Sequence, residues 1–145
     1  MEKNKEKRSV LIKWYRVENY FYKHNMVLFS KIIYHMIQII FGSTIPYQCV
    51  LEDGVNFAHF HGIVLNHECF IGKNTKIYHN VTVGGTDKGV PKIGKNCILG
   101  ANSVVLGNIV IGDNVIVGAG SVVTKSIPSN CTVCGVPAKI IKHKT

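Results

Sequence analysis

The sequence lacks the features that mark secreted, disulfide-bonded or membrane-spanning proteins. Its 145 residues contain five cysteines, and this odd number gives no even disulfide framework. The first residues contain no apolar segment of the signal-peptide kind. The most apolar run covers residues 26–41, is interrupted by polar residues, and is short for a bilayer span. We therefore expect one folded unit in a reduced, cytoplasmic setting.

Acidic residues are also scarce. The chain has eight Asp and Glu against 17 Lys and Arg, which gives a formal charge of +9. Residues 1–50 carry eight basic and three acidic residues, residues 51–138 carry six and five, and residues 139–145 carry three and none. Since the body of the chain is nearly neutral, we expect no nucleic-acid partner. We interpret the basic ends as solvated tails. Contact of the basic N-terminus with a membrane surface, at the inner membrane face, is the alternative.

What the sequence has instead is an internal repeat of six residues. An aliphatic residue or Phe recurs at this spacing, with two extra residues between 57 and 65 and four between 83 and 93. An antiparallel hairpin protein would alternate with a period of two and vary in strand length. The repeat positions are Leu51, Phe57, Leu65, Ile71, Ile77, Val83, Ile93, Leu99, Val105, Ile111, Val117 and Val123.

The residues between the repeat positions fit a coil with regular turns. Asn or Gly stands three residues after most of them, and both tolerate the positive φ of a turn. Six residues to a side predict a mainly β fold, a parallel β-helix of hexapeptide repeats with three sides to a coil. We place this domain at 44–145, with an emergent loop at 84–92. Apolar residues at helical spacing predict a short N-terminal α-helical segment, so residues 1–43 form a basic tail and amphipathic helices that cap the first coil.

Function in such a coil is read along columns, because residues one coil apart lie about 4.8 Å from each other. Allowing for the two insertions, one outward column contains His59, His79, Ala101 and Ala119. The alanines leave a shallow groove for a thin ligand, and this groove leads to the two imidazoles. Imidazole is suited to proton transfer near neutral pH, so His59 and His79 are the candidate catalytic residues. A lone histidine would more often be an ordinary exposed or hydrogen-bonded residue.

The other polar candidates are less specific. His61 lies four residues after a repeat position and is expected to point inward, while His67 is expected to face outward on the next side. Four histidines within 59–79 suggest a metal cluster, but no ligand spacing there is specific. Cys131 and Cys134 form a lone CxxC without a second pair. We therefore assign no metal site.

Five short strings are specific enough to carry a family resemblance. They are Ala-His-Phe-His-Gly-Ile-Val at 58–64, Val-Thr-Val-Gly-Gly-Thr at 81–86, Pro-Lys-Ile-Gly at 91–94, Gly-Ala-Gly-Ser-Val-Val at 118–123 and Gly-Val-Pro-Ala-Lys-Ile at 135–140. Across residues 44–142 the chain resembles the hexapeptide acyltransferases, and within them the serine O-acetyltransferase-like branch, which includes sugar and capsule O-acetyltransferases. The resemblance implies a left-handed parallel β-helix, a homotrimer, and acetyl-CoA bound as co-substrate between subunits.

The resemblance also implies roles for single residues. The family's catalytic histidine aligns with His59, which would remove the proton of an acceptor hydroxyl. The alkoxide then attacks the thioester carbonyl, and backbone amides stabilise the oxyanion. Lysines in the groove would meet CoA phosphates as point charges. The cofactor-binding groove aligns with Gly84, Gly85, Ala101, Ala119, Thr124, Lys125 and Lys142.

Departures from true serine acetyltransferases bear on the acceptor. The aspartate before the catalytic histidine is replaced by Ala58, and the upstream supporting aspartate by Thr44. The Arg-His pair that grips the amino-acid carboxylate is missing from a loop that offers only Gly89 and Val90. We therefore expect a sugar hydroxyl as acceptor, in a nucleotide sugar, a glycan intermediate or a capsule polysaccharide. The orienting partner of His59 stays open, with a backbone carbonyl as one option.

Three alternatives remain at this point. The first is a serine O-acetyltransferase, which the family resemblance supports and the lost carboxylate clamp opposes. The second is a zinc-dependent hydratase, because some hexapeptide prisms resemble this one and bind zinc between subunits through histidines. The third is a non-catalytic prism that serves assembly. Neither of the last two explains the residues of the cofactor groove.

Overall fold

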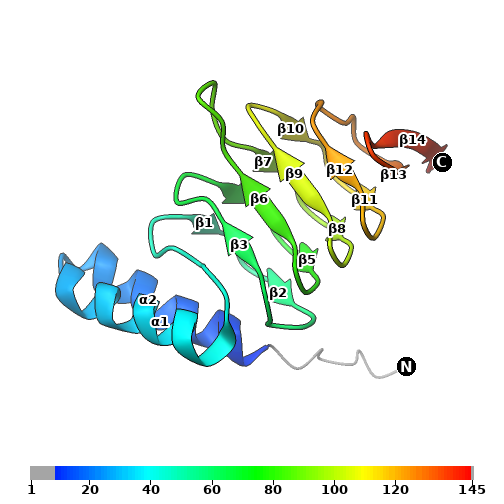
Figure 1. Cartoon of the computed structure of the whole chain (residues 1–145). Helices are drawn as coiled ribbons and strands as arrows, with labels where there is room; N and C mark the ends of the chain where they lie inside the picture. Colours follow the sequence, from blue (N-terminus) through cyan, green and yellow to red (C-terminus); the bar gives the residue numbers. More distant parts are fainter. Residues whose placement is uncertain (1–8, 145) are drawn as a thin grey trace, which may run out of the picture.

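The computed structural model of the chain describes residues 9–144, and the basic tail expected at residues 1–8 lies outside this range. Two helices, α1 (Val10–Lys23) and α2 (Val27–Phe41), precede a stack of short strands. Figure 1 shows the helices side by side at the end where the chain enters the stack, with the C-terminus near the opposite end. The helices therefore cover the first coil.

The strands form three sheets, each made of strands from successive coils. Sheet A contains β3 (Val64–Leu65), β6 (Thr82–Gly84), β9 (Val104–Leu106) and β12 (Val122–Val123). Sheet B contains β1 (Val50–Leu51), β4 (Phe70–Ile71), β7 (Lys92–Ile93) and β10 (Val110–Ile111). Sheet C contains β2 (Asn56–Phe57), β5 (Lys76–Ile77), β8 (Ile98–Leu99), β11 (Ile116–Val117), β13 (Cys131–Cys134) and β14 (Lys139–His143).

Strand pairing identifies the coil as a solenoid. Each strand pairs in parallel with strands of the neighbouring coils, and only β14 runs antiparallel to β13. Strands one coil apart are in register, as in the pairing of Phe57 with Ile77 and of Val64 with Thr82. The predicted fold is confirmed: the chain is mainly β, a left-handed parallel β-helix of hexapeptide repeats with an α-helical segment at its N-terminus.

The repeat positions form the core of the solenoid. All twelve are buried, and so is the residue four positions after each of them, except at His61 and Asp87. These two exceptions lie at the two-residue insertion and in the emergent loop. The expectation that His61 points inward is therefore wrong, since its side chain is exposed. The two-residue insertion moves the inward position to Ile63, which is fully buried beside Val81, so His61 is left on the outside.

Three corners join the sheets and are named here by their contents. The asparagine corner joins sheet B to sheet C and comprises residues 52–55, 72–75, 94–97, 112–115 and 128–130. The histidine corner joins sheet C to sheet A and comprises residues 58–63, 78–81, 100–103 and 118–121. The loop corner joins sheet A to sheet B and comprises residues 66–69, 85–91, 107–109 and 124–126.

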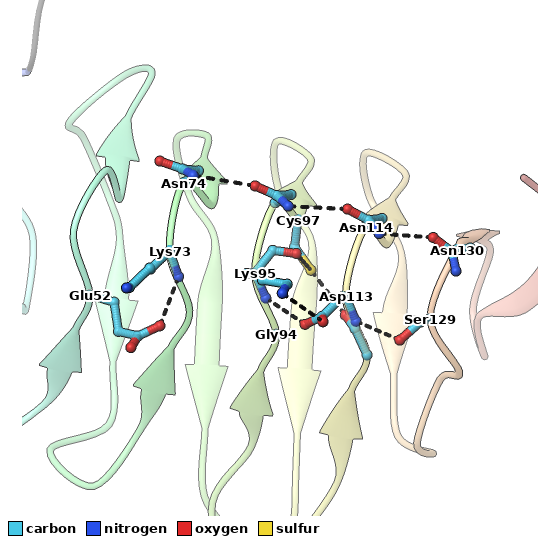
Figure 2. A network of polar contacts seen from close by, with 12 residues as sticks. Glu52, Lys73, Asn74, Gly94, Lys95, Cys97, Asp113, Asn114, Ser129 and Asn130 are labelled. Carbon is cyan, nitrogen blue, oxygen red and sulfur yellow. Dashed lines mark hydrogen bonds and ion pairs between the residues drawn. The ribbon is translucent and has the colours of Figure 1, made fainter.

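The asparagine corner is closed by a ladder of side-chain amides. Asn74, Asn96, Asn114 and Asn130 all have positive φ, near +60°, which asparagine tolerates. Each amide nitrogen donates to the carbonyl oxygen of the next asparagine, at 3.4, 3.2 and 2.9 Å along the stack. Figure 2 shows this row beside a second row of bonds, in which side-chain oxygens accept from backbone N–H groups of a neighbouring coil: Glu52 from Lys73, Asp113 from Lys95, and Ser129 from Asp113.

The helices are fastened to the first coil by polar bonds as well as apolar packing. The hydroxyl of Ser9 accepts a bond from the N–H of Leu11 and caps α1. Tyr15 donates its hydroxyl to the carbonyl of Cys49 at 2.6 Å, and the Asn19 amide donates to the Tyr47 carbonyl at 2.8 Å. Within residues 9–144, no helix is both long enough and apolar enough to cross a bilayer.

Candidate active site

The histidine corner brings together the two histidines that the sequence predicts as neighbours. The ring centroids of His59 and His79 are 5.5 Å apart, and the ring planes meet at 70°. Strand register explains this contact, because Phe57 pairs with Ile77 and the chain continues from both into the same corner. The ring of Tyr78 lies 6.1 Å from His59. Since His59 is exposed and His79 half-buried, both imidazoles can meet a substrate from solvent.

The two-residue insertion adds a third histidine to this corner. The backbone N–H of Asn80 donates to the carbonyl of His61 at 3.0 Å, so His61 also lies one coil from His79. A shallow cavity of about 300 Å³ is lined by His59, His61, His79 and Asn80. Sequence reasoning missed His61 and Asn80 as parts of the site. The signal was the insertion itself, because extra residues at one corner must project outward.

The groove predicted below the histidines follows the same corner. The N–H of Asn102 donates to the carbonyl of His79 at 3.1 Å, and the N–H of Gly120 donates to the carbonyl of Ala101 at 2.8 Å. Ala101 and Ala119 thus succeed His79 along the stack, with Ala101 half-buried and Ala119 exposed. Their methyl groups leave room along this edge for an extended ligand.

Within residues 9–144, no protein group orients the imidazoles of His59 and His79 by a hydrogen bond. Among residues 9–144, no hydrogen bond reaches a ring nitrogen of His59 or His79. Ala58 and Thr44 occupy the places of the two carboxylates that the resemblance would supply. The backbone carbonyl considered as an alternative partner does not accept a bond from His59 either. Both ring nitrogens are therefore free to bind a substrate or a residue of another subunit.

The remaining residues of the predicted cofactor groove lie at other places on the coil. Gly84 ends β6 and Gly85 begins the emergent loop, while Thr124 and Lys125 follow β12, so all four are at or beside the loop corner. Sheet A separates this corner from the histidine corner. Gly84 follows His79 by five residues along the coil, an extended length of roughly 16 Å at about 3.3 Å per residue. Within one chain, the structure does not bring these four residues to the histidines.

Lys142 and the emergent loop lie apart from the two histidines. Lys142 is exposed on β14, opposite Thr132 in sheet C, away from both groups. The loop folds back on itself through two backbone bonds between Thr86 and Gly89, at 2.9 and 3.1 Å. A side chain at Gly85 would come within 3.0 Å of Val90, so the loop packs tightly where it leaves the coil.

A second cavity was not predicted from the sequence. It measures about 750 Å³ and lies between α2 and sheet A, where neither helix nor strand periodicity shows which side chains will face each other. Cationic, imidazole and hydroxyl side chains gather there beside the start of the loop. Its polar lining includes Lys31, Tyr34, His35, Thr44, Gln48 and His67. His67 faces outward, as expected, and was given no role.

Metal ligation is limited by the same geometry. Across residues 9–144, no group of three or more His, Cys, Asp or Glu side chains is placed to hold a metal ion. A zinc site of the hydratase type would have to draw ligands from more than one chain.

Comparison with known proteins supports the family resemblance. Residues 91–125 match the family model described as bacterial transferase hexapeptide (six repeats). The serine acetyltransferase of Synechococcus elongatus is 36% identical over 131 residues, which are 88% of this chain and 54% of that protein. The chain thus spans about half the length of the curated relatives it matches.

Solved structures give the same result. The crystal structure of serine acetyltransferase from Brucella abortus strain S19 has a TM-score of 0.88 and 36% identity, covering 92% of this chain and 56% of that one. A structure of serine acetyltransferase from the same strain in complex with coenzyme A has a TM-score of 0.87 and 36% identity, covering 92% and 55%.

These relatives correct the expected acceptor. The sugar or polysaccharide hydroxyl is wrong, because the relatives and structures are serine acetyltransferases. The expectation gave too much weight to the missing Arg-His pair. Losing one clamp removes one means of holding a carboxylate, whereas His61, His79 and Asn80 bring other N–H donors to the corner. By its repeats, its coil and its relatives, the chain is similar to the hexapeptide-repeat acyltransferases, whose family model it matches over residues 91–125.

Proposed function

We propose that this protein is an acetyl-CoA-dependent O-acetyltransferase whose acceptor is the hydroxyl of L-serine. The observation that carries this proposal is the open pair of imidazoles, with ring centroids 5.5 Å apart, at the head of a groove of small residues. The serine acetyltransferases that match the chain at 36% identity support serine as the acceptor. Coenzyme A in the Brucella abortus complex supports acetyl-CoA as the donor.

His59 acts as the general base in this proposal. Its unprotonated ring nitrogen takes the proton of the serine hydroxyl, and the hydroxyl oxygen attacks the carbonyl carbon of the acetyl thioester. The tetrahedral intermediate then expels the CoA thiolate, which takes the proton back from the imidazolium ion. The products are O-acetylserine and CoA, and no oxidant or metal is consumed. The free ring nitrogens of His59 permit this cycle because no protein group occupies them in residues 9–144.

The carboxylate of serine needs donors that replace the missing Arg-His pair. His61, His79 and Asn80 line the same cavity as His59 and offer N–H groups to an anionic acceptor. A neutral histidine donates one hydrogen bond, and a protonated one donates two and adds charge. These residues therefore provide a carboxylate-binding site with less positive charge than a site that contains an arginine.

Assembly as a homotrimer completes the proposed site. The groove residues are divided between the histidine corner and the loop corner, on opposite edges of sheet A. Packing the loop corner of one subunit against the histidine corner of the next would reunite them between subunits. Lys125 would then meet a CoA phosphate, and Gly84 and Gly85 would let the ligand approach the backbone. Use of acetyl-CoA agrees with the cytoplasmic location that we propose from the sequence.

Measuring thiol release from acetyl-CoA tests the proposal. We expect turnover with L-serine, and much less with D-serine, L-alanine or a panel of free sugars. His59→Ala should abolish turnover, whereas His24→Ala, an exposed histidine after α1, should leave it intact. Equal rates with serine and with no acceptor would refute the serine assignment. Light scattering separately tests the trimer, since a monomer that turns over serine at full rate would refute the shared site.

A further inference from the structure

The outer surface of the helix pair is apolar although it is exposed. Of the eighteen exposed large apolar residues within residues 9–144, twelve lie between Val10 and Ile40. Ordinary surfaces carry such residues singly, and a contiguous patch usually marks a contact with another molecule. The helix pair is therefore the part of the described chain whose surface is least suited to water.

Helix α2 carries the most apolar part of this surface. One side of α2 packs on α1 and the first coil through Ile37 and Phe41. Leu28, Ile32 and Ile39 project from the opposite side, and their side chains are 69, 49 and 84% exposed. At about 100° per residue, these three positions lie within about 40° of each other on the helix. The α2 outer face is defined as Leu28, Ile32, Met36, Ile39 and Ile40.

The charge around this face has one sign. Lys13, Lys23 and Lys31 are exposed on the two helices. Glu18 is the one acidic residue of residues 9–43, and its side chain is fully buried. The helix pair thus presents no exposed carboxylate to balance its lysines. An occupant that matches this surface must combine apolar groups with negative charge.

We propose that the α2 outer face docks on the surface of an anionic lipid bilayer. Apolar side chains of an interfacial helix enter the boundary between headgroups and acyl chains, and lysines at its margin pair with lipid phosphates. Lys31 and Lys13 are placed to extend their stems along the apolar surface in this way. The 15 residues of α2 are about 22 Å long, against about 30 Å for the hydrocarbon core, so α2 lies in the interface and does not span it.

A second copy of the chain fits this face less well. A copy docked through the same face would bring exposed lysines towards exposed lysines, with no carboxylate in residues 9–43 to pair with them. Like charges brought together at a contact are destabilising. Anionic headgroups supply the charge that a copy lacks. Charge complementarity therefore favours lipid over self-association.

A groove between the helices extends the apolar surface. It measures about 280 Å³ and is lined by Lys13, Trp14, Val17 and Ile33. Its walls are apolar and its charged group is a lysine, as expected of a surface that meets lipid. Trp14 is the single tryptophan of the chain, so its fluorescence reports on this surface without a label.

Vesicle flotation with the full chain tests the proposal. We expect the protein to float with phosphatidylcholine vesicles that contain phosphatidylglycerol, and about thirtyfold less with phosphatidylcholine alone, because Lys13 and Lys31 each contribute about 1 kcal/mol near an anionic surface. Anionic vesicles should also shift the Trp14 emission to shorter wavelength. The double variant Ile32→Glu/Ile39→Glu should lose flotation. Val110→Glu, which places one carboxylate on an exposed valine of β10, should float like the wild type.

The outcomes separate docking from its alternatives. No flotation and no change of emission with anionic vesicles would overturn the proposal, and so would equal flotation of the double variant and the wild type. If the double variant instead breaks up a larger assembly of a wild type that does not float, the face is a subunit contact. Melting curves check the fold, and Ile32→Gln/Ile39→Gln replaces the double variant if that one unfolds. Acetyl transfer without vesicles should be unchanged in the double variant, so failure of docking leaves the proposed function standing.

Discussion

The asparagine corner and the histidine corner are built on the same six-residue repeat, yet their side chains have opposite roles. At the asparagine corner, four asparagines bond to one another along the stack and a second row bonds side chains to backbone. At the histidine corner, the side-chain amide of Asn80 donates a hydrogen bond to that of Asn102, and the row ends there because the next coil has Gly120 at this position. The outward column of this corner holds two histidines and two alanines. The side chains of the asparagine corner thus bond to each other and to the backbone, whereas the imidazoles of His59 and His79 make no hydrogen bond within residues 9–144.

The difference shows how a solenoid can separate stability from chemistry. Because every coil repeats the same inward packing, one corner can close the stack while another carries groups without internal partners. Unsatisfied groups are costly only when they are buried, and the histidine corner is open to water. We therefore expect changes at the two corners to affect different measurements.

Replacing His59 should give the largest effect. His59→Ala removes the proposed base, so we expect kcat with L-serine to fall by roughly 10²–10⁴. The free energy of unfolding should change little, because the side chain is exposed and has no hydrogen-bond partner in residues 9–144. Steady-state kinetics and a thermal melt measure the two quantities. A variant with normal kcat would show that the histidine corner is not the site of proton transfer.

Glu18 provides a stability change outside both corners. Burial raises the pKa of its carboxyl from about 4.5 to about 9, and neither carboxyl oxygen has a hydrogen-bond partner in the described residues. The folded state therefore holds a proton that the unfolded state releases above pH 4.5. The contribution of Glu18 to stability is fully present below pH 4.5 and is lost as the pH rises to about 9.

The expected effect of Glu18 is on the order of a few kcal/mol across this range. Glu18→Gln cannot ionise, so it should not lose stability in this way. The free energy of unfolding of the wild type should therefore fall relative to that of the variant as the pH rises from 5 to 9. Denaturant titrations at several pH values measure this difference. Parallel pH dependence in the two proteins would mean that the carboxyl is ionised in the fold. Turnover by folded protein should be the same in both.

Breaking the amide ladder should cost about 2 kcal/mol. Asn96→Ala removes bonds to Asn74 and Asn114 and places alanine at a φ of +55°. Asn108→Ala is the matched control, since Asn108 is exposed at the loop corner and does not have positive φ. Urea titration should show a loss for the first variant and almost none for the second. If kcat of folded Asn96→Ala fell as far as that of His59→Ala, the separation of the corners would be disproved.

Replacing His79 should give the smallest effect. His79→Ala leaves the proposed base in place and removes one donor from the cavity, so we expect kcat/KM for L-serine to fall by about tenfold, in line with one hydrogen bond to a charged group. The loss should lie mainly in KM. A fall as large as that of His59→Ala would instead make the two histidines equal partners in proton transfer.

Regular packing is the part of this protein that the sequence predicts well. Every repeat position read from the sequence is buried, because the inward positions of a coil depend only on local period. His59 and His79 were placed as neighbours by the same arithmetic, since register follows from counting residues per coil. The prediction for His61 is wrong because an insertion breaks the period, and within the insertion counting does not show which way a side chain turns.

Recognition of the acceptor failed for a different reason. Ala58 and the shortened loop predict a lost carboxylate clamp, but a binding site is the sum of groups from several coils and subunits. The sequence shows which group is missing and does not show which groups converge to replace it. Relatives, and not the residues, overturned the sugar acceptor and support the serine that we propose.

The sequence by itself determined the solenoid, the helical segment and the histidine column, because each depends on spacing along one chain. Only the tertiary structure decided which corner holds each candidate residue and which side of α2 faces solvent. It also decided that the Glu18 carboxyl is buried with no hydrogen-bond partner within residues 9–144. Those properties depend on how the chain winds between coils and how the helices settle on them. The separation of the histidine corner from the loop corner and the exposure of one face of α2 arise from packing in three dimensions. The periodicity of the sequence carries no information about this packing.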